Sequence, residues 1–382
     1  MSYSEIVSKV PVDALLEITR RASPESVKAV LSRGKASGLE DFARLISPAA
    51  DSSLEWQASL AQGLTTKHFG KVIRLFAPLY LSNECINTCK YCGFSMRNRI
   101  PRVTIPVTQV VEETRKLARQ GFRSLLLVAG EHPRHVSNGY VEECIRACLD
   151  LMPSIALEVG PMETEGYVPL VQAGCEGLIV YQETYNRECY RTLHTAGPKK
   201  NYDWRLDTPE RAYDAGFRRI GIGALMGLHD WRYEALMLAA HAQYLTRHCW
   251  KAQLSVSFPR MRPASGGYEV NPSHMIRDRE MVRLVTALRL LLPHASFVLS
   301  TRESPDFRDG MMRLGITQMS AGSSTEPGGY SSFDETAWKA SESAGGEQFV
   351  IADDRSPAEV ASMIRESGYD PVWKDFDQSL VA

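Results

Sequence analysis

Three cysteines lie within eight residues of the chain, in the segment CINTCKYC at residues 85–92. Cysteine thiolates are soft ligands that suit zinc and iron–sulfur clusters. A structural zinc site needs a fourth Cys or His to complete its tetrahedron, and the next histidine downstream is His132. Three thiolates can instead hold three corners of a four-iron cluster and leave one iron open to a small molecule. We therefore favour Cys85, Cys89 and Cys92 as ligands of a 4Fe–4S cluster over a zinc site or three buried thiols.

Composition narrows the classes of partner. The 382 residues are 44% hydrophobic and 23% charged, and 44 basic residues against 45 acidic residues give a net charge of -1. No overall field attracts nucleic acid or an anionic membrane, so a small-molecule substrate is favoured. The first residues, MSYSEIVSKV, lack the pattern of a signal peptide, and no run approaches the length of a membrane span. We therefore expect a cytoplasmic protein, in which eight cysteines are ligands or core residues rather than disulfides.

Eight short apolar runs rich in β-branched residues alternate with segments of helical periodicity, which predicts βα units and a parallel sheet. Eight such units predict a closed (β/α)8 barrel of the TIM type, in the α/β class. The predicted strands are residues 74–82, 124–130, 156–160, 177–183, 219–225, 252–258, 295–301 and 315–321. The clearest helical segments between them are residues 107–121, 233–249 and 277–292.

The two ends of the chain differ from this pattern. Residues 1–70 carry helix-start residues and no strand signal, which predicts a helical extension packed against a barrel at residues 71–322. Residues 323–382 begin with a stretch rich in Gly, Ser and Pro, which predicts a long irregular loop up to residue 350. Ser356 and Glu359 then form a capping box, so a helix completes the domain.

Polar residues and a glycine follow several predicted strands. Barrel active sites are built at the carboxyl ends of the strands, so we expect these residues to face the same cavity as the cysteine loop. Gly130 allows a ligand to approach the backbone closely, and Glu131 can pair with an ammonium group. The other candidates are Gln182, Glu183, Arg260, Arg262, Arg302 and Ser320.

Structural explanations compete with these functional ones. Glu131 could simply neighbour a helix N-terminus. The three arginines could brace loops through ion pairs, although the guanidinium group is also shaped to hold a carboxylate with two parallel hydrogen bonds. The glycines at 221, 223 and 227 do not have dinucleotide-binding spacing and are more typical of a barrel wall. Isolated cysteines outside the loop are typical of the core.

The cysteine spacing CxxxCxxC, with Tyr91 before the last cysteine and Phe94 shortly after it, closely resembles the signature of the radical S-adenosylmethionine (SAM) superfamily. From about residue 70 to the end, the chain is also similar to the 2-iminoacetate synthase family, the tyrosine lyases of anaerobic thiamine biosynthesis. The shared segments are LYLSNECINTCKYCGFSM, VYQETYNRECY, HTAGPKKNYDWRLDTPERA, GIGALMGLHDWR, SFPRMRP, LSTRES and DPVWKDFD. This resemblance implies a biotin and thiamin synthesis associated region at about residues 250–360, overlapping the barrel end.

The resemblance also implies a reaction. A reduced 4Fe–4S cluster donates an electron to SAM, which yields methionine and a 5′-deoxyadenosyl radical. The radical takes a hydrogen atom from the amino group of L-tyrosine, and cleavage of the Cα–Cβ bond gives p-cresol and 2-iminoacetate (dehydroglycine). No catalytic residue beyond the cofactor assembly is expected, because the cofactors supply the reactivity.

Site roles follow from the same resemblance. Glu131 with Gly130 matches the residues that meet the SAM ammonium, and Phe94, Gln182 and Glu183 are further candidates for SAM contacts. Arg302 matches the position that holds the substrate carboxylate in related lyases, and Ser320 matches a hydroxyl beside the amino acid. Arg260 and Arg262 are additional candidates for substrate contacts.

Partners and rivals complete the expectations. A thiazole synthase is expected to receive dehydroglycine, and a flavodoxin or ferredoxin to supply the electron; no nucleic acid or membrane partner is expected. The rival enzymes are a hydrogenase maturase, which carries further C-terminal cysteines where this chain has none after Cys249, and a tryptophan lyase. The rival of another class is a non-catalytic, zinc-stabilised scaffold for thiazole synthase.

Overall fold

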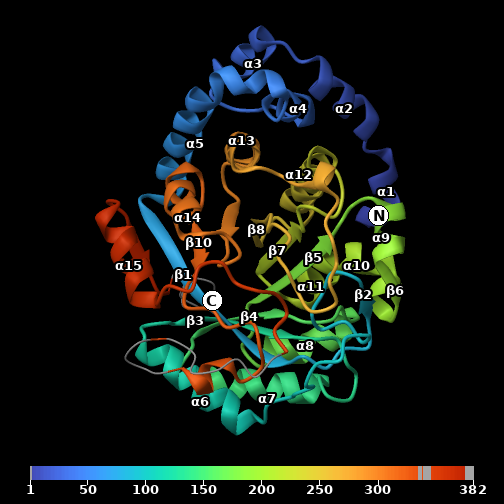
Figure 1. The fold of residues 1–382 in the computed structure, drawn as a ribbon, viewed down its shortest axis with the longest axis vertical. Coiled ribbons are helices and arrows are strands. Elements are labelled where there is room, and N and C mark those ends of the chain that lie inside the picture. Colours follow the sequence, from blue (N-terminus) through green and yellow to red (C-terminus); the bar gives the residue numbers. More distant parts are fainter. Residues whose placement is uncertain (1, 334–337, 339–345, 375–382) are drawn as a thin grey trace.

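The computed structural model describes residues 2–333, 338 and 346–374. Eight parallel strands form a closed barrel, because each strand pairs with the next and the last pairs with the first (Figure 1). The predicted (β/α)8 fold is therefore confirmed, with strand ends within a few residues of those predicted. The barrel strands are β1 (Val72–Ser82), β3 (Ser124–Ala129), β4 (Ser154–Glu158), β5 (Gly177–Glu183), β7 (Arg219–Ala224), β8 (Gln253–Ser257), β9 (Ser296–Leu299) and β10 (Gln318–Ser320).

Helices surround the barrel and connect successive strands. The three predicted helical segments form α6, α12 and α13, and Asp230 caps α12 by accepting hydrogen bonds from the backbone N–H groups of Arg232 and Tyr233, both at 3.0 Å. None of the described helices combines the length and apolar composition needed to cross a membrane. The helices between strands are α6 (Val107–Arg119), α7 (Asn138–Cys148), α8 (Thr164–Gln172), α9 (Arg187–Leu193), α10 (Tyr202–Leu206), α11 (Thr208–Ala215), α12 (Trp231–His248), α13 (Asp278–Leu291) and α14 (Pro305–Met311).

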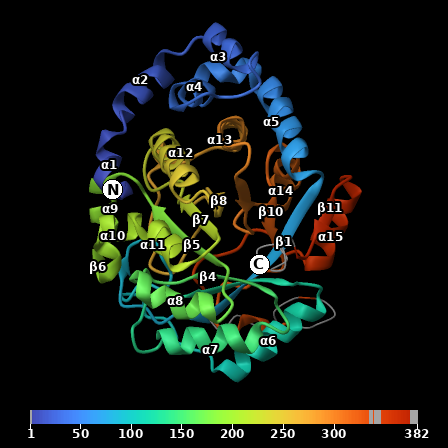
Figure 2. The same ribbon diagram turned by 180° about the vertical axis from the view of Figure 1, so that it is seen from behind.

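The N-terminal helices form an arch along one side of the barrel, beside α12 and α13 (Figures 1 and 2). Buried hydrogen bonds attach the arch to α13: Gln57 Nε2 donates to Thr286 Oγ1 at 2.8 Å, and the Ala36 N–H donates to the Leu290 carbonyl at 3.0 Å. The helices are α1 (Tyr3–Ile6), α2 (Val12–Arg21), α3 (Pro24–Leu31), α4 (Leu39–Leu45) and α5 (Leu54–Phe69).

The C-terminal segment returns to the start of the barrel. The predicted capping box is present, since the Glu359 N–H donates to Ser356 Oγ at 3.2 Å and begins α15 (Pro357–Glu366). The strand β11 (Asp370–Val372) then pairs in parallel with the first residues of β1. The predicted loop at residues 323–350 contains one short 3-10 helix, Gly329–Ser332, among its described residues. Its residues 334–337 and 339–345 lie outside the described part of the chain.

A buried ion pair anchors this segment beneath the mouth of the barrel. The guanidinium of Arg308, on α14, pairs with the Asp353 carboxylate and donates to the Ser320 carbonyl, and all three residues are buried. Burial alone would raise the pKa of the Asp353 carboxyl. Arg355 and Arg308 nevertheless hold this pKa below its usual value. Because Ser320 ends β10, the ion pair fixes one strand end that faces the candidate site.

Candidate active site

The cysteine loop follows β1 and is clamped on two sides. Its strand β2 (Thr88–Cys89) pairs antiparallel with β6 (His194–Ala196), which follows α9. On the other side, the Gly93 N–H donates to the Gln348 carbonyl at 3.0 Å. A Cβ at Gly93 would lie only 2.7 Å from that carbonyl oxygen, so a glycine is required for this close approach. The loop is therefore held between segments that are distant in sequence.

Arg102 fixes the fold of the loop from within. Its guanidinium donates four hydrogen bonds of 2.6–3.1 Å to backbone carbonyl oxygens. A single side chain thereby satisfies carbonyls that would otherwise lack partners in a tight loop. The four carbonyls belong to Asn83, Phe94, Ser95 and Asn98.

Cys85, Cys89 and Cys92 line one cavity at the carboxyl ends of the strands, as the cluster prediction requires. Burial raises the pKa of the Cys89 thiol to about 12 and also raises that of Cys92, while the Lys199 cation opposes both shifts. Buried thiols of this kind ionise when they bind a metal centre, because the cation compensates for the lost hydration. Besides the charge of such a metal centre, the Lys199 cation also favours the ionised form of both thiols.

The spacing of the sulfurs can be compared with that expected for a single zinc ion. Tetrahedral zinc with four sulfur ligands places its sulfurs about 3.8 Å apart, given Zn–S bonds of about 2.3 Å. Among the residues that the structure describes, only Glu84, His132 and His135 bring three potential ligand atoms within 4.8 Å of one another. The three cysteine sulfurs are therefore not all within 4.8 Å of one another, and as they stand they do not surround a single tetrahedral ion.

Glu131 and Gly130, at the end of β3, line the same cavity. Asn87, in the cysteine loop, donates from Nδ2 to Glu131 Oε2 at 2.6 Å and approaches Cys85 Sγ at 3.7 Å. The Glu131 side chain lies over Gly160, where an added Cβ would be 2.5 Å from its Cγ. The carboxylate is thus positioned by an amide donor on one side and by the absence of a side chain on the other.

Glu183, at the end of β5, also faces the cysteines. The pairing of β5 with β7 shifts register at this point, and Glu183 has a positive φ of 72°. Strained backbone of this kind costs about 1–3 kcal/mol and is concentrated at functional sites. Lys199 Nζ lies 2.7 Å from Glu183 Oε1, and Arg205 Nη2 lies 3.4 Å from the same oxygen. Burial alone would raise the pKa of the Glu183 carboxyl. The cations of Lys199 and Arg205 nevertheless hold this pKa below its usual value.

The neighbouring Gln182 does not reach this cavity. Its side chain is buried on the outer side of the strand, where Nε2 donates to the Tyr202 carbonyl at 3.4 Å. Successive side chains of a strand point to opposite faces, so Gln182 and Glu183 cannot both face inward. The structure therefore separates two residues that the sequence analysis treated together.

A second cavity adjoins the first deeper in the barrel. It is lined by Arg302, Ser320, Tyr80 and many apolar side chains, and it shares Val128, Glu158 and Gln348 with the cysteine cavity. The Arg302 guanidinium carbon lies 3.3 Å from the centroid of the Phe349 ring. Within the described part of the chain, this guanidinium makes no hydrogen bond or ion pair. Its donors are available to an anionic group in the cavity.

Arg260 and Arg262 lie outside both cavities and brace the loops around Arg302. Arg260 pairs with Glu303 and Asp278, with Nη1 2.6 Å from Asp278 Oδ1. Arg262 Nε donates to the Arg302 carbonyl, and its Nη2 is 3.7 Å from Glu303 Oε2. The predicted substrate contact is therefore not supported for these two arginines, and the alternative of loop bracing describes them.

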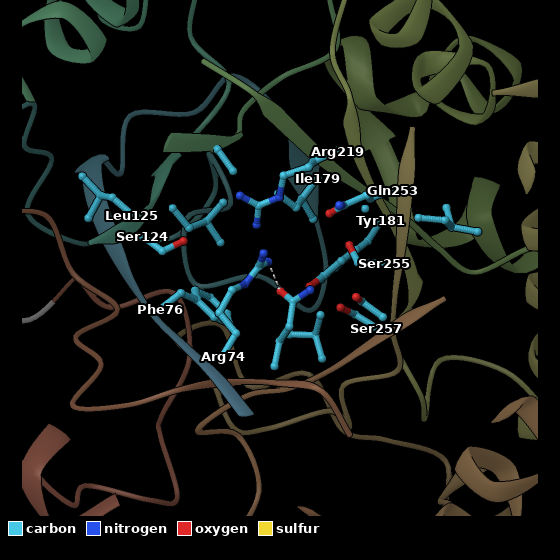
Figure 3. A pocket seen from close by; sticks show the side chains of 17 residues that line it. Arg74, Phe76, Ser124, Leu125, Ile179, Tyr181, Arg219, Gln253, Ser255 and Ser257 are labelled. Carbon is cyan, nitrogen blue, oxygen red and sulfur yellow. Dashed lines mark hydrogen bonds between the residues drawn. The ribbon is translucent and has the colours of Figure 1, made fainter. Parts of the chain in front are cut away.

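A third cavity lies below the second in the barrel interior (Figure 3). The guanidinium groups of Arg74 and Arg219 extend toward its middle, where Arg74 donates to Gln318. Arg219 pairs with Glu176, on the loop before β5. These polar groups fill the end of the barrel that is distant from the cysteine loop.

Several site residues were not identified from the sequence. Asn87 lies within the cysteine motif, and Lys199 and Arg205 lie in the shared segment HTAGPKKNYDWRLDTPERA, but the sequence indicated no role for any of the three. Only the fold shows that they line the cavity of the cysteines. Glu158 carried a usable signal, because it is a carboxylate in an otherwise apolar predicted strand, ALEVG at residues 156–160. It lines both the cysteine cavity and the Arg302 cavity.

Comparison with known proteins agrees with this geometry. A model of the radical SAM superfamily matches residues 79–240, and a model of the Biotin and Thiamin Synthesis associated domain matches residues 257–370. The 2-iminoacetate synthase of Escherichia coli (strain K12) is 43% identical over 342 residues, which are 89% of this chain and 88% of that protein. The corresponding protein of Salmonella typhimurium (strain LT2) is 42% identical over the same length.

A solved structure shares the fold. The crystal structure of HydG, a maturase of the [FeFe]-hydrogenase, has a TM-score of 0.87 at 30% identity, covering 95% of this chain and 79% of that chain. The sequence match to the two synthases is higher and spans more of their length. Together with both family models, it confirms the predicted resemblance. The chain belongs to the 2-iminoacetate synthase family of the radical SAM superfamily.

Proposed function

We propose that this protein is a 2-iminoacetate synthase that cleaves the Cα–Cβ bond of L-tyrosine to 2-iminoacetate and p-cresol, consuming SAM, for the thiazole of thiamine. The observation that carries the proposal is the junction of two cavities. One contains the three cysteines, the other contains Arg302, whose guanidinium has no hydrogen-bond or ion-pair partner among the described residues, and they share Val128, Glu158 and Gln348. A cofactor at the cysteines and an amino acid at Arg302 would meet at this junction.

The residues of the first cavity fit a 4Fe–4S cluster and SAM, as membership of the superfamily implies. When bound, the reduced cluster and SAM supply a radical that removes a hydrogen atom from the substrate. Cys85, Cys89 and Cys92 would hold the cluster. Glu131 would accept hydrogen bonds from the methionine ammonium of SAM, with Gly130 allowing close approach of the backbone.

Two further residues of this cavity are suited to the nucleoside part of SAM. Glu183 is held ionised at Oε1 by Lys199 and Arg205, so Oε2 can accept hydrogen bonds from ribose hydroxyls. Phe94 is buried against Tyr80, with ring centroids 5.8 Å apart, and offers an apolar surface beside the cysteines.

The second cavity fits tyrosine. Arg302 would hold the substrate carboxylate through two parallel hydrogen bonds, which orients the amino acid as well as binding it. Ser320 lies in the same cavity, and its hydroxyl accepts a hydrogen bond from the Thr301 N–H at 3.1 Å. Apolar residues of the lining, including Phe76, would surround the aromatic ring.

Dehydroglycine is hydrolysed by water, so an enclosed site and direct transfer to a thiazole synthase are advantageous. We propose that protein as the partner, with a flavodoxin or ferredoxin as the electron donor. The maturase-like activity is the second candidate, because the HydG fold matches this chain closely. A zinc-bound scaffold is disfavoured because the chain matches the radical SAM superfamily model over residues 79–240.

The test is anaerobic incubation of cluster-loaded protein with tyrosine, SAM and a reductant. We expect p-cresol, 5′-deoxyadenosine and glyoxylate, the hydrolysis product of dehydroglycine, in equal amounts. Carbon monoxide or cyanide among the products would favour the maturase-like activity. A product that retains an indole group, formed from tryptophan but not from tyrosine, would favour a tryptophan lyase and contradict the proposal.

A further inference from the structure

Glu158 is the last residue of β4 and lies where the two cavities meet. Along the described chain, its carboxylate forms no hydrogen bond and no ion pair, and Arg302, in the same cavity, is equally unpaired. The two groups influence each other electrostatically without contact. The Arg302 cavity thus contains the Glu158 carboxylate and the Arg302 guanidinium, which are too far apart to form an ion pair with each other.

Such a pair complements the charges of an α-amino acid zwitterion. If the substrate carboxylate binds Arg302, its ammonium group points to a position between Arg302 and the cysteine cavity. Glu158 is the acidic residue that lines both cavities. Glu183 lines only the cysteine cavity and is already paired with Lys199 and Arg205.

We propose that Glu158 binds the α-amino group of the substrate and accepts a proton from it. The proposal rests on the proposed function and assigns a role in that reaction. In the proton transfer, an ammonium N–H bond breaks and a carboxyl O–H bond forms, while the electron pair stays on nitrogen. The amine is then neutral, the form in which loss of a hydrogen atom gives an uncharged nitrogen radical.

The surroundings of Glu158 suit a group that exchanges protons near neutrality. Burial and the Glu183 carboxylate raise the pKa of Glu158 to about 7, against the opposing effect of three cations. A base with a pKa near the working pH is effective at proton transfer. The charged and titratable groups facing Glu158 are Glu183, Arg302, Lys199, Arg205, Tyr80 and Tyr181.

The test is a binding experiment on cluster-loaded protein with SAM but no reductant, so that no turnover occurs. Three ligands separate the two charged groups: tyrosine, tyramine without a carboxylate, and 3-(4-hydroxyphenyl)propionate without an amine. Glu158→Gln should weaken tyrosine and tyramine at least tenfold and leave the propionate unchanged or tighter. Arg302→Lys should weaken tyrosine and the propionate and spare tyramine.

Proton exchange provides the second readout, from calorimetry in buffers of different ionisation enthalpy. A free carboxyl with a pKa of about 7 is half protonated at pH 7, whereas the bound carboxyl and amine share one proton. Tyrosine should therefore release part of a proton near neutral pH, and the release should grow as the pH falls toward 6 and fade as it rises toward 8.5. The propionate should release none.

Glu234→Gln is the matched control. Burial raises the pKa of Glu234 to about 7 as well, but Glu234 accepts hydrogen bonds from Thr184 Oγ1 and, at 2.8 Å, from the Tyr185 N–H, and it lines neither cavity. This variant should keep the proton release, which Glu158→Gln should abolish. Should Glu158→Gln not fold, the three ligands with unmodified protein decide the matter.

Equal affinity of the unmodified protein for tyrosine and the propionate, with no proton release, would overturn the role of Glu158. The proposed function fails separately, by absence of p-cresol from tyrosine under reducing conditions. An enzyme that makes p-cresol but shows unchanged ligand preference in Glu158→Gln would keep its function and lose this inference.

Discussion

Gly160→Ala tests how Glu131, the proposed partner of the SAM ammonium group, is positioned. An alanine Cβ would lie 2.5 Å from Cγ and 2.8 Å from Cδ of Glu131, closer than real side chains approach. Gly160 has no positive φ, so the backbone accepts alanine without strain. The Glu131 side chain must therefore move, and its 2.6 Å hydrogen bond from Asn87 is lost.

The expected cost follows from the bond that is displaced. Hydrogen bonds to ionised groups contribute about 1.5–3 kcal/mol, which corresponds to a roughly 10- to 150-fold change in an equilibrium constant. We expect SAM affinity to fall by about this factor in cluster-loaded, unreduced protein, measured by equilibrium dialysis. The iron content should stay unchanged, because the cysteines are not touched.

Two comparisons make the result interpretable. Gly139→Ala, in α7, is the control, because nothing lies within 4 Å of its added Cβ and SAM affinity should be unchanged. In a Glu131→Ala background, Gly160→Ala should have little further effect, since both changes remove the same contact. SAM affinity within twofold of the original in Gly160→Ala, or full additivity of the two changes, would refute the positioning of Glu131 by Gly160.

Three more outcomes are expected. Cys89→Ala should lose the cluster and all SAM cleavage; iron and sulfide assays that show retention would count against the ligand assignment. Arg302→Lys should lower kcat/KM for tyrosine by about 10- to 100-fold and affect uncoupled SAM cleavage less, because the fork geometry is lost; equal losses would indicate a structural role. Asp353→Asn should lower stability by about 3–5 kcal/mol in thermal unfolding, because it leaves Arg308 buried without its counter-charge. Since the pKa of Asp353 is lowered, this contribution is complete above about pH 4 and is lost at lower pH; an unchanged Tm would contradict it.

The barrel could be predicted because each strand is a short apolar run with turn residues at its ends. The cysteine spacing likewise predicted membership of the radical SAM superfamily, and the strand order placed the cysteines at the carboxyl edge of the barrel. Glu131 and Arg302 could be located because they directly follow strands. These signals are local in the sequence. They predict positions in the fold correctly because the barrel repeats one βα unit.

Other features depend on contacts that no local pattern encodes. The strands β2 and β6 have two and three residues, too few for a recognisable alternation, so their pairing was not predicted. The β5–β7 pairing shifts register between Tyr181 and Glu183, and the ion pairs of Glu183 with Lys199 and Arg205 join segments that are distant in sequence. Arg260 could be assigned to bracing only once its partners, Glu303 and Asp278, were located.

The most direct test of the account is the metal content of the protein after anaerobic reconstitution with iron and sulfide, followed by electron paramagnetic resonance of the reduced protein. We predict about four iron and four sulfide per chain, bound through Cys85, Cys89 and Cys92, and a change in the spectrum when SAM is added. A colourless protein that binds one zinc ion through these cysteines and shows no response to SAM would contradict the account.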